Sequence, residues 1–421
     1  MREAPGGAPA QGATSASLRS NFAWTFAGNS FYAAGQWVIL SLFAKLGGSE
    51  MLGQYALAVA LTAPVVMLSH LNLRAVLATD VGGQYPFGDY LAVRLGTTAA
   101  ALVAIAGIAA ATGGSWPLAG AVVAVGVAQC AETASDIYHG AMQRRERMGQ
   151  IARSIIARTS VSVAALGAAL WMTHNLVWAV AALAVGRLAV LLAYDRHAGA
   201  AGENLSRSGL RAELAIFRTA LPLGVVLMLV SLNANLPRYA VEHHLGTRDL
   251  GVFAAVVSFI TVGSTIVNAL GQTSTPRLAR YFSECNLPRF RQLIFRLAGL
   301  VLLLGASGVL VAMFLGKFVL RLIYRPEYGA HSGLLVAVMG AATLSYLAIA
   351  LGYAVTGARV FRAQMPLFCA VAACCGVASW LLVPKLGLYG AVLALALASS
   401  LQIAGQLLIL VWAIRRMETA K

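Results

Sequence analysis

Charge is scarce in this chain. Only 11% of its 421 residues are Asp, Glu, Lys or Arg, whereas 59% are hydrophobic and the mean hydropathy is +0.76. A soluble domain carries about 25% charged residues, because charges keep a water-facing surface hydrated. A chain with so little charge must use lipid as its solvent. The composition therefore excludes a soluble enzyme and predicts a membrane protein.

Acidic residues are the scarcest charges. There are 15 of them against 31 Lys and Arg, which gives a net charge of +16. A basic chain can bind nucleic acid, or its loops can face an anionic membrane leaflet. The basic residues lie in loops between apolar runs. We therefore expect these loops to face a membrane leaflet, and we expect no nucleic-acid partner.

The chain also lacks a metal or disulfide pattern. Its five cysteines contain no CxxC pair, and four of them lie in apolar segments, where cysteine packs as a small hydrophobic residue. We expect no metal site and no cofactor. Residues 1–20 are rich in Gly, Ala, Pro and Ser and contain no apolar run before a cleavage site. They predict a disordered cytoplasmic tail and no removed signal peptide.

Twelve stretches are long and apolar enough to cross a bilayer as helices, which takes about 20 residues. They are 22–44, 51–73, two within 95–131 divided at 113–117, two within 151–194 divided at 173–175, 219–237, 250–276, 297–316, 332–358, 363–384 and 386–414.

The distribution of Lys and Arg predicts the orientation of these spans. With the N-terminus inside, the clusters at 144–153, 196–218 and 277–296 all face the cytoplasm, as the positive-inside rule requires. The outer side then receives only Lys45, Arg238, Arg248, Lys317, Arg321, Arg325 and Lys385. We therefore predict a multi-pass protein of the bacterial inner membrane with both termini cytoplasmic.

Two short sequences recur half a chain apart. The segment 52–56 (LGQYA) is repeated as 250–254 (LGVFA), and 176–180 (LVWAV) as 388–392 (LYGAV). An even number of spans in each half makes the repeats parallel. We predict an all-α membrane protein with two six-helix bundles, 21–197 and 213–414, around a central cavity. A cytoplasmic linker, 198–212, joins them, and a cytoplasmic tail, 415–421, follows.

The segment 21–80, with Asn21-Phe22-Ala23-Trp24 and the LGQYALA run at 52–58, resembles a known family. It is similar to the polysaccharide-transporter branch of the multidrug/oligosaccharidyl-lipid/polysaccharide exporter superfamily. The resemblance covers the whole chain in topology and has no short catalytic signature. It implies a V-shaped pair of six-helix bundles that translocates undecaprenyl-pyrophosphate-linked repeat units of O-antigen, capsule or exopolysaccharide.

Polar side chains concentrate in the first two spans of each half, which line the central cavity in the resembled fold. Because a polar group facing lipid is costly, such residues face a cavity or another helix. The candidate substrate-binding residues are Asn29, Tyr32, Gln36, Asn233, Asn235, Asn268 and Gln272. The alternative is that these side chains only join neighbouring helices.

Arginines complete the candidate site. Arg74, Arg238 and Arg277 lie at the ends of the same four spans, and a pyrophosphate prefers bidentate guanidinium partners. The alternative for Arg74 and Arg277 is anchoring at the cytoplasmic edge.

Arg187 lies deep in its span, as does Arg158. A lone intramembrane arginine predicts function. The alternative is a structural pair with Glu132 or Asp136, which share one helix face.

The connections between spans are short. We expect Asp80 and Asp89 to form a loop ion-pair cluster with Arg74 and Arg94, and His243-His244 to lie in a solvated outer loop. The longest outer connections are 238–249 and 317–331. A polysaccharide polymerase or ligase usually needs a sizeable outer loop with catalytic residues, which makes this the weaker alternative.

The hypothesis that follows is a flippase, not an enzyme, which moves lipid-linked oligosaccharide by alternating access. Its expected partners are the lipid-linked oligosaccharide, membrane lipid, and polysaccharide polymerase and chain-length proteins. A multidrug or metabolite antiporter of the same fold is the main alternative. A cation exporter needs an acidic cavity, and the four lining spans contain no Asp or Glu in their charge-free cores.

Overall fold

The computed structural model describes residues 18–80, 83–112, 116–358, 360 and 363–419, and within them the chain forms helices and loops without a strand. Among these residues, eleven helical segments are long and apolar enough to cross a membrane, and the first, Ala23–Ala78, contains most of α1 and all of α2. The first half contains α1 (Leu18–Leu42), a π-helix (Phe43–Gly47), α2 (Gly48–His70), α3 (Leu73–Thr79), α4 (Phe87–Ala111), α5 (Trp116–Arg144), α6 (Met148–Thr173), α7 (Leu176–Val190), a second π-helix (Leu191–Asp195) and α8 (Arg196–Ala200). The second contains α9 (Leu210–Leu245), α10 (Thr247–Ser283), α11 (Leu287–Ile323), a 3-10 helix (Pro326–His331), α12 (Ser332–Gly357), α13 (Gln364–Leu386) and α14 (Leu388–Thr419).

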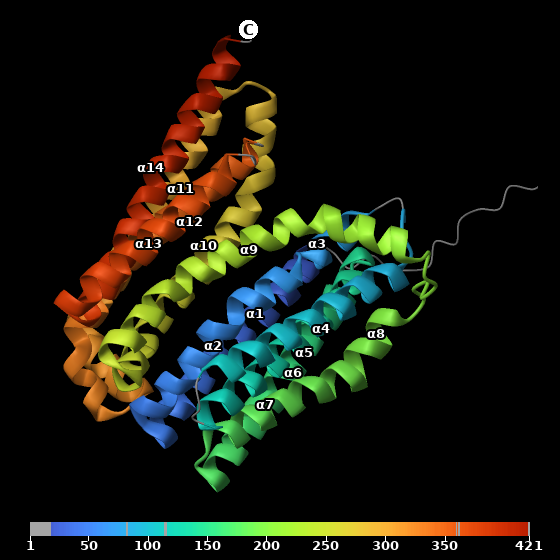
Figure 1. Ribbon diagram of the computed structural model, residues 1–421. Coiled ribbons are helices and arrows are strands. Elements are labelled where there is room, and N and C mark those ends of the chain that lie inside the picture. The colour runs from blue at the N-terminus through green and yellow to red at the C-terminus, as the bar shows by residue number, and fades with distance from the viewer. Residues whose placement is uncertain (1–17, 81–82, 113–115, 359, 361–362, 420–421) are drawn as a thin grey trace, which may run out of the picture.

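The two halves pack their helices in the same pattern, and Figure 1 shows them as the arms of a V. In the first half α1 packs on α6, α2 and α4 on α5, and α5 and α6 on α7. In the second half α9 packs on α13, α10 and α11 on α12, and α12 and α13 on α14. The predicted fold class, two six-helix membrane bundles with parallel repeats, is confirmed.

The arms of the V meet where α2 crosses α10, and the first sequence repeat forms this crossing. A Cβ added to Gly53 would lie 1.7 Å from the Thr247 carbonyl oxygen, and one added to Gly251 would lie 1.8 Å from that of Ser49. The contact is reciprocal, as expected for two related helices that cross on a pseudo-twofold axis. Glycine is needed at both positions because the two backbones are in contact.

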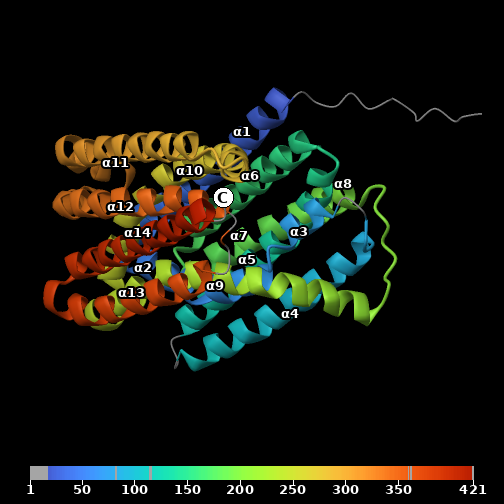
Figure 2. The same cartoon turned by 90° about the horizontal axis from the view of Figure 1, so that it is seen from above.

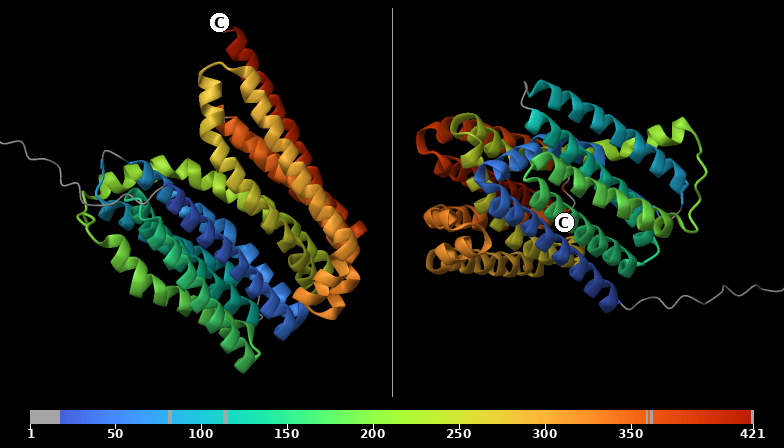
Figure 3. Two further views of the ribbon diagram at one scale, coloured as in Figure 1. Left: turned by 180° about the vertical axis from the view of Figure 1, so that it is seen from behind. Right: turned by 90° about the horizontal axis from the view of Figure 1, so that it is seen from below.

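Helix α9 connects the bundles along one side of the V. Its first part, with Ile216 and Ala220, belongs to an apolar cluster with Leu71 and Phe87 of the first bundle. Its last part packs on α13 of the second bundle. Figures 2 and 3 show α9 along one side of the molecule and α1 and α10 on the opposite side.

Several predicted loops are helical instead. Helix α9 continues to Leu245, and only Gly246 separates it from α10, so the predicted outer loop 238–249 was wrong. His243 and His244 lie in the last turn of α9 and contact the ring of Trp380. A helix of 36 residues is about 54 Å long, whereas the bilayer core is about 30 Å thick, so polar helix ends extend beyond the lipid.

The predicted ion-pair cluster in the loop after Arg74 is also corrected. Asp89 and Arg94 belong to α4 and are completely buried. Asp89 accepts a hydrogen bond from the Ser208 backbone NH at 2.8 Å, which attaches the linker to the first bundle. Of the predicted tails, residues 18–20 and 415–419 continue α1 and α14, while 1–17 and 420–421 lie outside the described residues.

Candidate functional site

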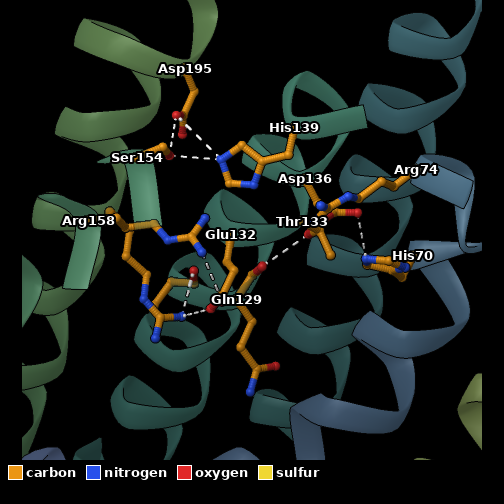
Figure 4. Close-up of polar contacts among 12 residues, drawn as sticks. His70, Arg74, Gln129, Glu132, Thr133, Asp136, His139, Ser154, Arg158 and Asp195 are labelled. Atoms are coloured by element: carbon orange, nitrogen blue, oxygen red, sulfur yellow. Dashed lines mark hydrogen bonds and ion pairs between the residues drawn. The ribbon is translucent and has the colours of Figure 1, made fainter. Parts of the chain in front are cut away.

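Helix α5 carries a polar stripe through the middle of the first bundle. Its members are Gln129, Glu132, Thr133, Asp136 and His139. Gln129, the adjacent pair Glu132 and Thr133, Asp136 and His139 follow one another at intervals of three or four residues, so the stripe stays on one side of the helix. Figure 4 shows this stripe between His70 and Arg74 on one side and Ser154 and Arg158 on the other. The stripe organises three polar groups.

The deepest group is centred on Glu132. Its carboxylate lies 2.7 Å from Arg187 Nη1 of α7 and 3.3 Å from Arg158 Nη2 of α6, and it accepts a hydrogen bond from Tyr32 of α1. Arg158 and Arg187 are both buried. Two guanidinium groups on one carboxylate leave a net positive charge, and Arg158 Nη1 has no hydrogen-bond partner. The alternative that the sequence left open, an ion pair between these arginines and Glu132, is what the structure contains.

The second group is centred on Asp136, near an interruption between α2 and α3. His70 Nε2 and Arg74 Nη1 each lie 3.1 Å from its carboxylate, and Arg74 Nε donates to Gln143 at 2.8 Å. Between these helices Leu71 and Asn72 both have positive φ, of 50° and 49°. Consecutive left-handed residues that are not glycine end a helix. Arg94 donates to the Ser69 carbonyl of the interrupted helix at 3.2 Å.

The third group joins α5, α6 and the second π-helix. His139 Nε2 lies 2.8 Å from Ser154 Oγ, which donates to Asp195 Oδ1 at 2.5 Å. A nucleophilic triad needs an accessible serine and a carboxylate that orients the histidine. Here Ser154 is completely buried and donates to the carboxylate itself. The group therefore holds helices together.

The first two groups line a cavity of about 320 Å³ inside the first bundle. Its floor is formed by α5 and α6, and its walls by α1, α2 and α3. Helices α1 and α2 each contribute side chains to its lining. It is lined by Asn29, Tyr32, Ala63, Val66, Met67, His70, Arg74, Gln129, Glu132, Thr133, Asp136, His139, Ile155 and Arg158.

The structure brings together part of the predicted site in the first half. Asn29, Tyr32 and Arg74 line this cavity, and Arg187 lies behind it on Glu132. Gln36 is half-buried further along α1. The stripe residues Gln129 and Thr133 were missed, although their spacing was visible in the sequence. They lie on the fourth span, whereas the predicted site was confined mainly to the first two spans of each half.

The predicted residues of the second half form separate groups. Arg238 Nη1 donates to Asn235 Oδ1 at 2.9 Å, one helical turn away on α9, where Asn233 also lies. Asn268 accepts a hydrogen bond from Tyr353 of α12 at 3.2 Å, and Gln272 hydrogen bonds to the same tyrosine. Arg277 is exposed on α10. These groups do not converge with the first-half cavity.

A set of hydrogen bonds joins the two bundles where they meet. Lys45 Nζ donates to the Leu322 carbonyl at 3.0 Å, and Arg325 donates to the Lys45 carbonyl at 2.8 and 3.1 Å. Ser41 Oγ donates to the Ile323 carbonyl at 2.5 Å. We call these residues the latch. The acceptors are backbone carbonyls at helix ends, which have no hydrogen-bond partner within their own helix.

Comparisons with known proteins agree with this architecture. A model of the family described as polysaccharide biosynthesis protein matches residues 118–282. The chain is 23% identical to the capsular polysaccharide biosynthesis protein CapF of Staphylococcus aureus over 381 residues, which is 90% of this chain and 95% of the relative. These matches confirm the resemblance that the sequence suggested.

Solved structures share the fold. An inward-facing multidrug resistance MATE family transporter of the MOP superfamily superposes with a TM-score of 0.75 and 11% identity, over 93% of this chain and 94% of that one. The lipid II flippase MurJ in an inward closed conformation also gives 0.75, with 10% identity, over 92% and 87%.

Proposed function

We propose that this relative of polysaccharide biosynthesis proteins moves lipid-linked oligosaccharide repeat units across the bacterial inner membrane by alternating access. The observation that carries the proposal is the geometry of the two bundles. They meet at one end through the latch and the Gly53–Gly251 crossing, and a polar cavity lined in part by α1 and α2 lies inside the first bundle. Two repeat-related bundles that rock about their contact can expose such a site to either side in turn.

The orientation predicted from Lys and Arg puts the latch on the outer side. Lys45 and Arg325 belong to the few basic residues assigned outside, whereas the basic ends of α5 and α10 are assigned to the cytoplasm. The bundles are then closed outside and separated inside. This is the state in which a flippase loads a cargo made in the cytoplasm.

The charges of the cavity favour a polar cargo over a cationic drug. Its two carboxylates, Glu132 and Asp136, are each held by two basic partners within 3.3 Å. A cation would have to displace these partners. The multidrug-antiporter alternative therefore has no free carboxylate in the described part of this cavity.

The lipid chain of the cargo needs an apolar surface. A second cavity, of about 210 Å³, is lined by α1 together with α10, α11 and α12 of the second bundle. Trp37, Phe259, Ile266 and Met339 are among its lining residues. Part of a polyprenyl chain can lie there while a sugar of its headgroup enters the polar cavity.

A deletion strain tests the function. We expect surface polysaccharide to disappear and lipid-linked repeat units to accumulate on the cytoplasmic side of the membrane, because synthesis continues without translocation. The measurement is the extraction of lipid-linked oligosaccharides, with their sidedness determined by a membrane-impermeant sugar-modifying reagent.

Two other results would replace the proposal. Single units on the periplasmic face would indicate intact translocation and a missing polymerase or ligase. Unchanged pools with increased sensitivity to cationic compounds would indicate a drug antiporter. A plasmid copy of the gene is the control, because it should restore the polysaccharide.

A further inference from the structure

The cavity of the first bundle contains buried polar atoms that no protein group satisfies. Arg158 is 6% exposed, and its Nη1 has no hydrogen-bond partner, nor does Gln129 Oε1. One is a donor and the other an acceptor, and both residues line the cavity. Buried polar groups are almost always hydrogen-bonded, so such a pair in a cavity indicates a polar ligand.

The mixture of donors and acceptors distinguishes between ligand classes. A pyrophosphate only accepts hydrogen bonds, so it cannot donate to the oxygen of Gln129. A sugar hydroxyl both donates and accepts. The several hydroxyls of one sugar ring can therefore accept from Arg158 Nη1 and donate to Gln129 Oε1 and to Thr133 Oγ1, whose own hydrogen is given to the Gln129 and Cys130 carbonyls.

The cavity's size limits the ligand. About 320 Å³ is at the lower end of the range of small-molecule pockets, roughly 300–1,000 Å³. One sugar ring therefore fits better than an oligosaccharide.

We propose that this cavity binds a single neutral sugar ring, with Arg158 as donor and Gln129 and Thr133 as polar partners. The inference rests on the proposed function, in which the ring is one sugar of the lipid-linked unit. It assigns sugar recognition to α5 and α6 of the first bundle and leaves the pyrophosphate to another part of the protein.

Saturation-transfer NMR on the purified full-length protein tests the site. The probes are the methyl glycosides of glucose, galactose and N-acetylglucosamine, with farnesyl diphosphate as the sugar-free comparison. We expect at least one glycoside to bind. Gln129→Leu should weaken its binding at least tenfold and Thr133→Val several-fold, whereas farnesyl diphosphate binding should remain unchanged in both variants.

The matched control is Gln150→Leu. Gln150 is also half-buried in the first bundle and also has an unpaired Oε1, but it does not line the cavity. Its substitution should leave glycoside binding unchanged. Because Thr133→Val changes one atom, it remains informative if Gln129→Leu does not fold.

Three results would overturn the proposal: no glycoside binds the wild-type protein, glycoside binding survives both substitutions, or diphosphate binding falls with them. The last would make the cavity an anion site.

The deletion strain separates this inference from the proposed function. If the strain accumulates cytoplasmic lipid-linked units but no glycoside binds, only the sugar site is wrong. If a glycoside binds but no units accumulate, only the flippase is wrong.

Discussion

Gly53→Ala should destabilise the protein by about 3 kcal/mol or more, the upper end of the cost of overpacking. The added Cβ would lie 1.7 Å from the Thr247 carbonyl oxygen, and a backbone atom cannot move aside as a side chain can. The bundles would have to separate at the contact about which they rock. Gly251→Ala should have the same effect, because its Cβ would lie 1.8 Å from the Ser49 carbonyl. Thermal unfolding of the purified protein in detergent measures both.

The control is another glycine within a helix. Gly340 of α12 has no atom within 4 Å of an added Cβ, so Gly340→Ala should be neutral or stabilise by about 0.5–1 kcal/mol through helix propensity. If the Gly53→Ala variant unfolds at the same temperature as the wild-type protein, α2 and α10 do not cross as closely as described.

Glu132→Gln should cost about 3–5 kcal/mol, the penalty for removing one member of a buried ion pair. It would leave Arg158 and Arg187 buried without a counter-charge, because both depend on this carboxylate. We expect a large loss of folded protein, measured by size-exclusion chromatography and thermal unfolding. Adding Arg187→Met should recover part of the stability, since one of the uncompensated charges is then removed.

A surface pair provides the comparison. Arg280 and Glu284 lie 3.8 Å apart with more than half of each side chain exposed, so Glu284→Gln should change stability little. Additive effects of Glu132→Gln and Arg187→Met would show that the two residues do not interact. The buried network would then have no structural role.

The spans could be predicted from the sequence because the bilayer imposes a simple rule. About 20 apolar residues are needed to cross it, and charges mark the ends. The helix breaks at 113–117 and 173–175 were predicted where α4 ends and α5 begins, and where α6 ends and α7 begins. The repeats 52–56 and 250–254 indicated two related halves, and the structure places them at one crossing.

The helix ends could not be predicted by that rule. Outside the lipid, polar residues suit a loop and an exposed helix equally well, so α9 and α10 continued through segments expected to be loops. The interruption at Leu71 and Asn72 has no Gly or Pro to mark it. It depends on tertiary contacts, including the hydrogen bond from the buried Arg94 to Ser69.

The candidate site was only partly predictable, because the two halves share a fold but not their chemistry. Polar residues near the start of each half were expected to form one central site. Instead the first half holds ion pairs on α5, while Asn235 and Asn268 of the second half bond within their own bundle. Which neighbouring residue a polar side chain contacts depends on how its helix is rotated about its own axis. The spacing of polar residues along one helix does not determine that rotation.

The most direct test of the central claim is transport with the latch held closed. A cysteine-free variant carrying Ser41→Cys and Ile323→Cys places thiols on two residues that the hydrogen bond from Ser41 Oγ to the Ile323 carbonyl now holds in contact. In liposomes, translocation of a fluorescent lipid-pyrophosphate-linked oligosaccharide is followed with a membrane-impermeant quencher. We expect translocation before treatment with a short thiol cross-linker and none after it. Equal rates in both states, or rates no faster than in protein-free liposomes, would contradict an alternating-access flippase.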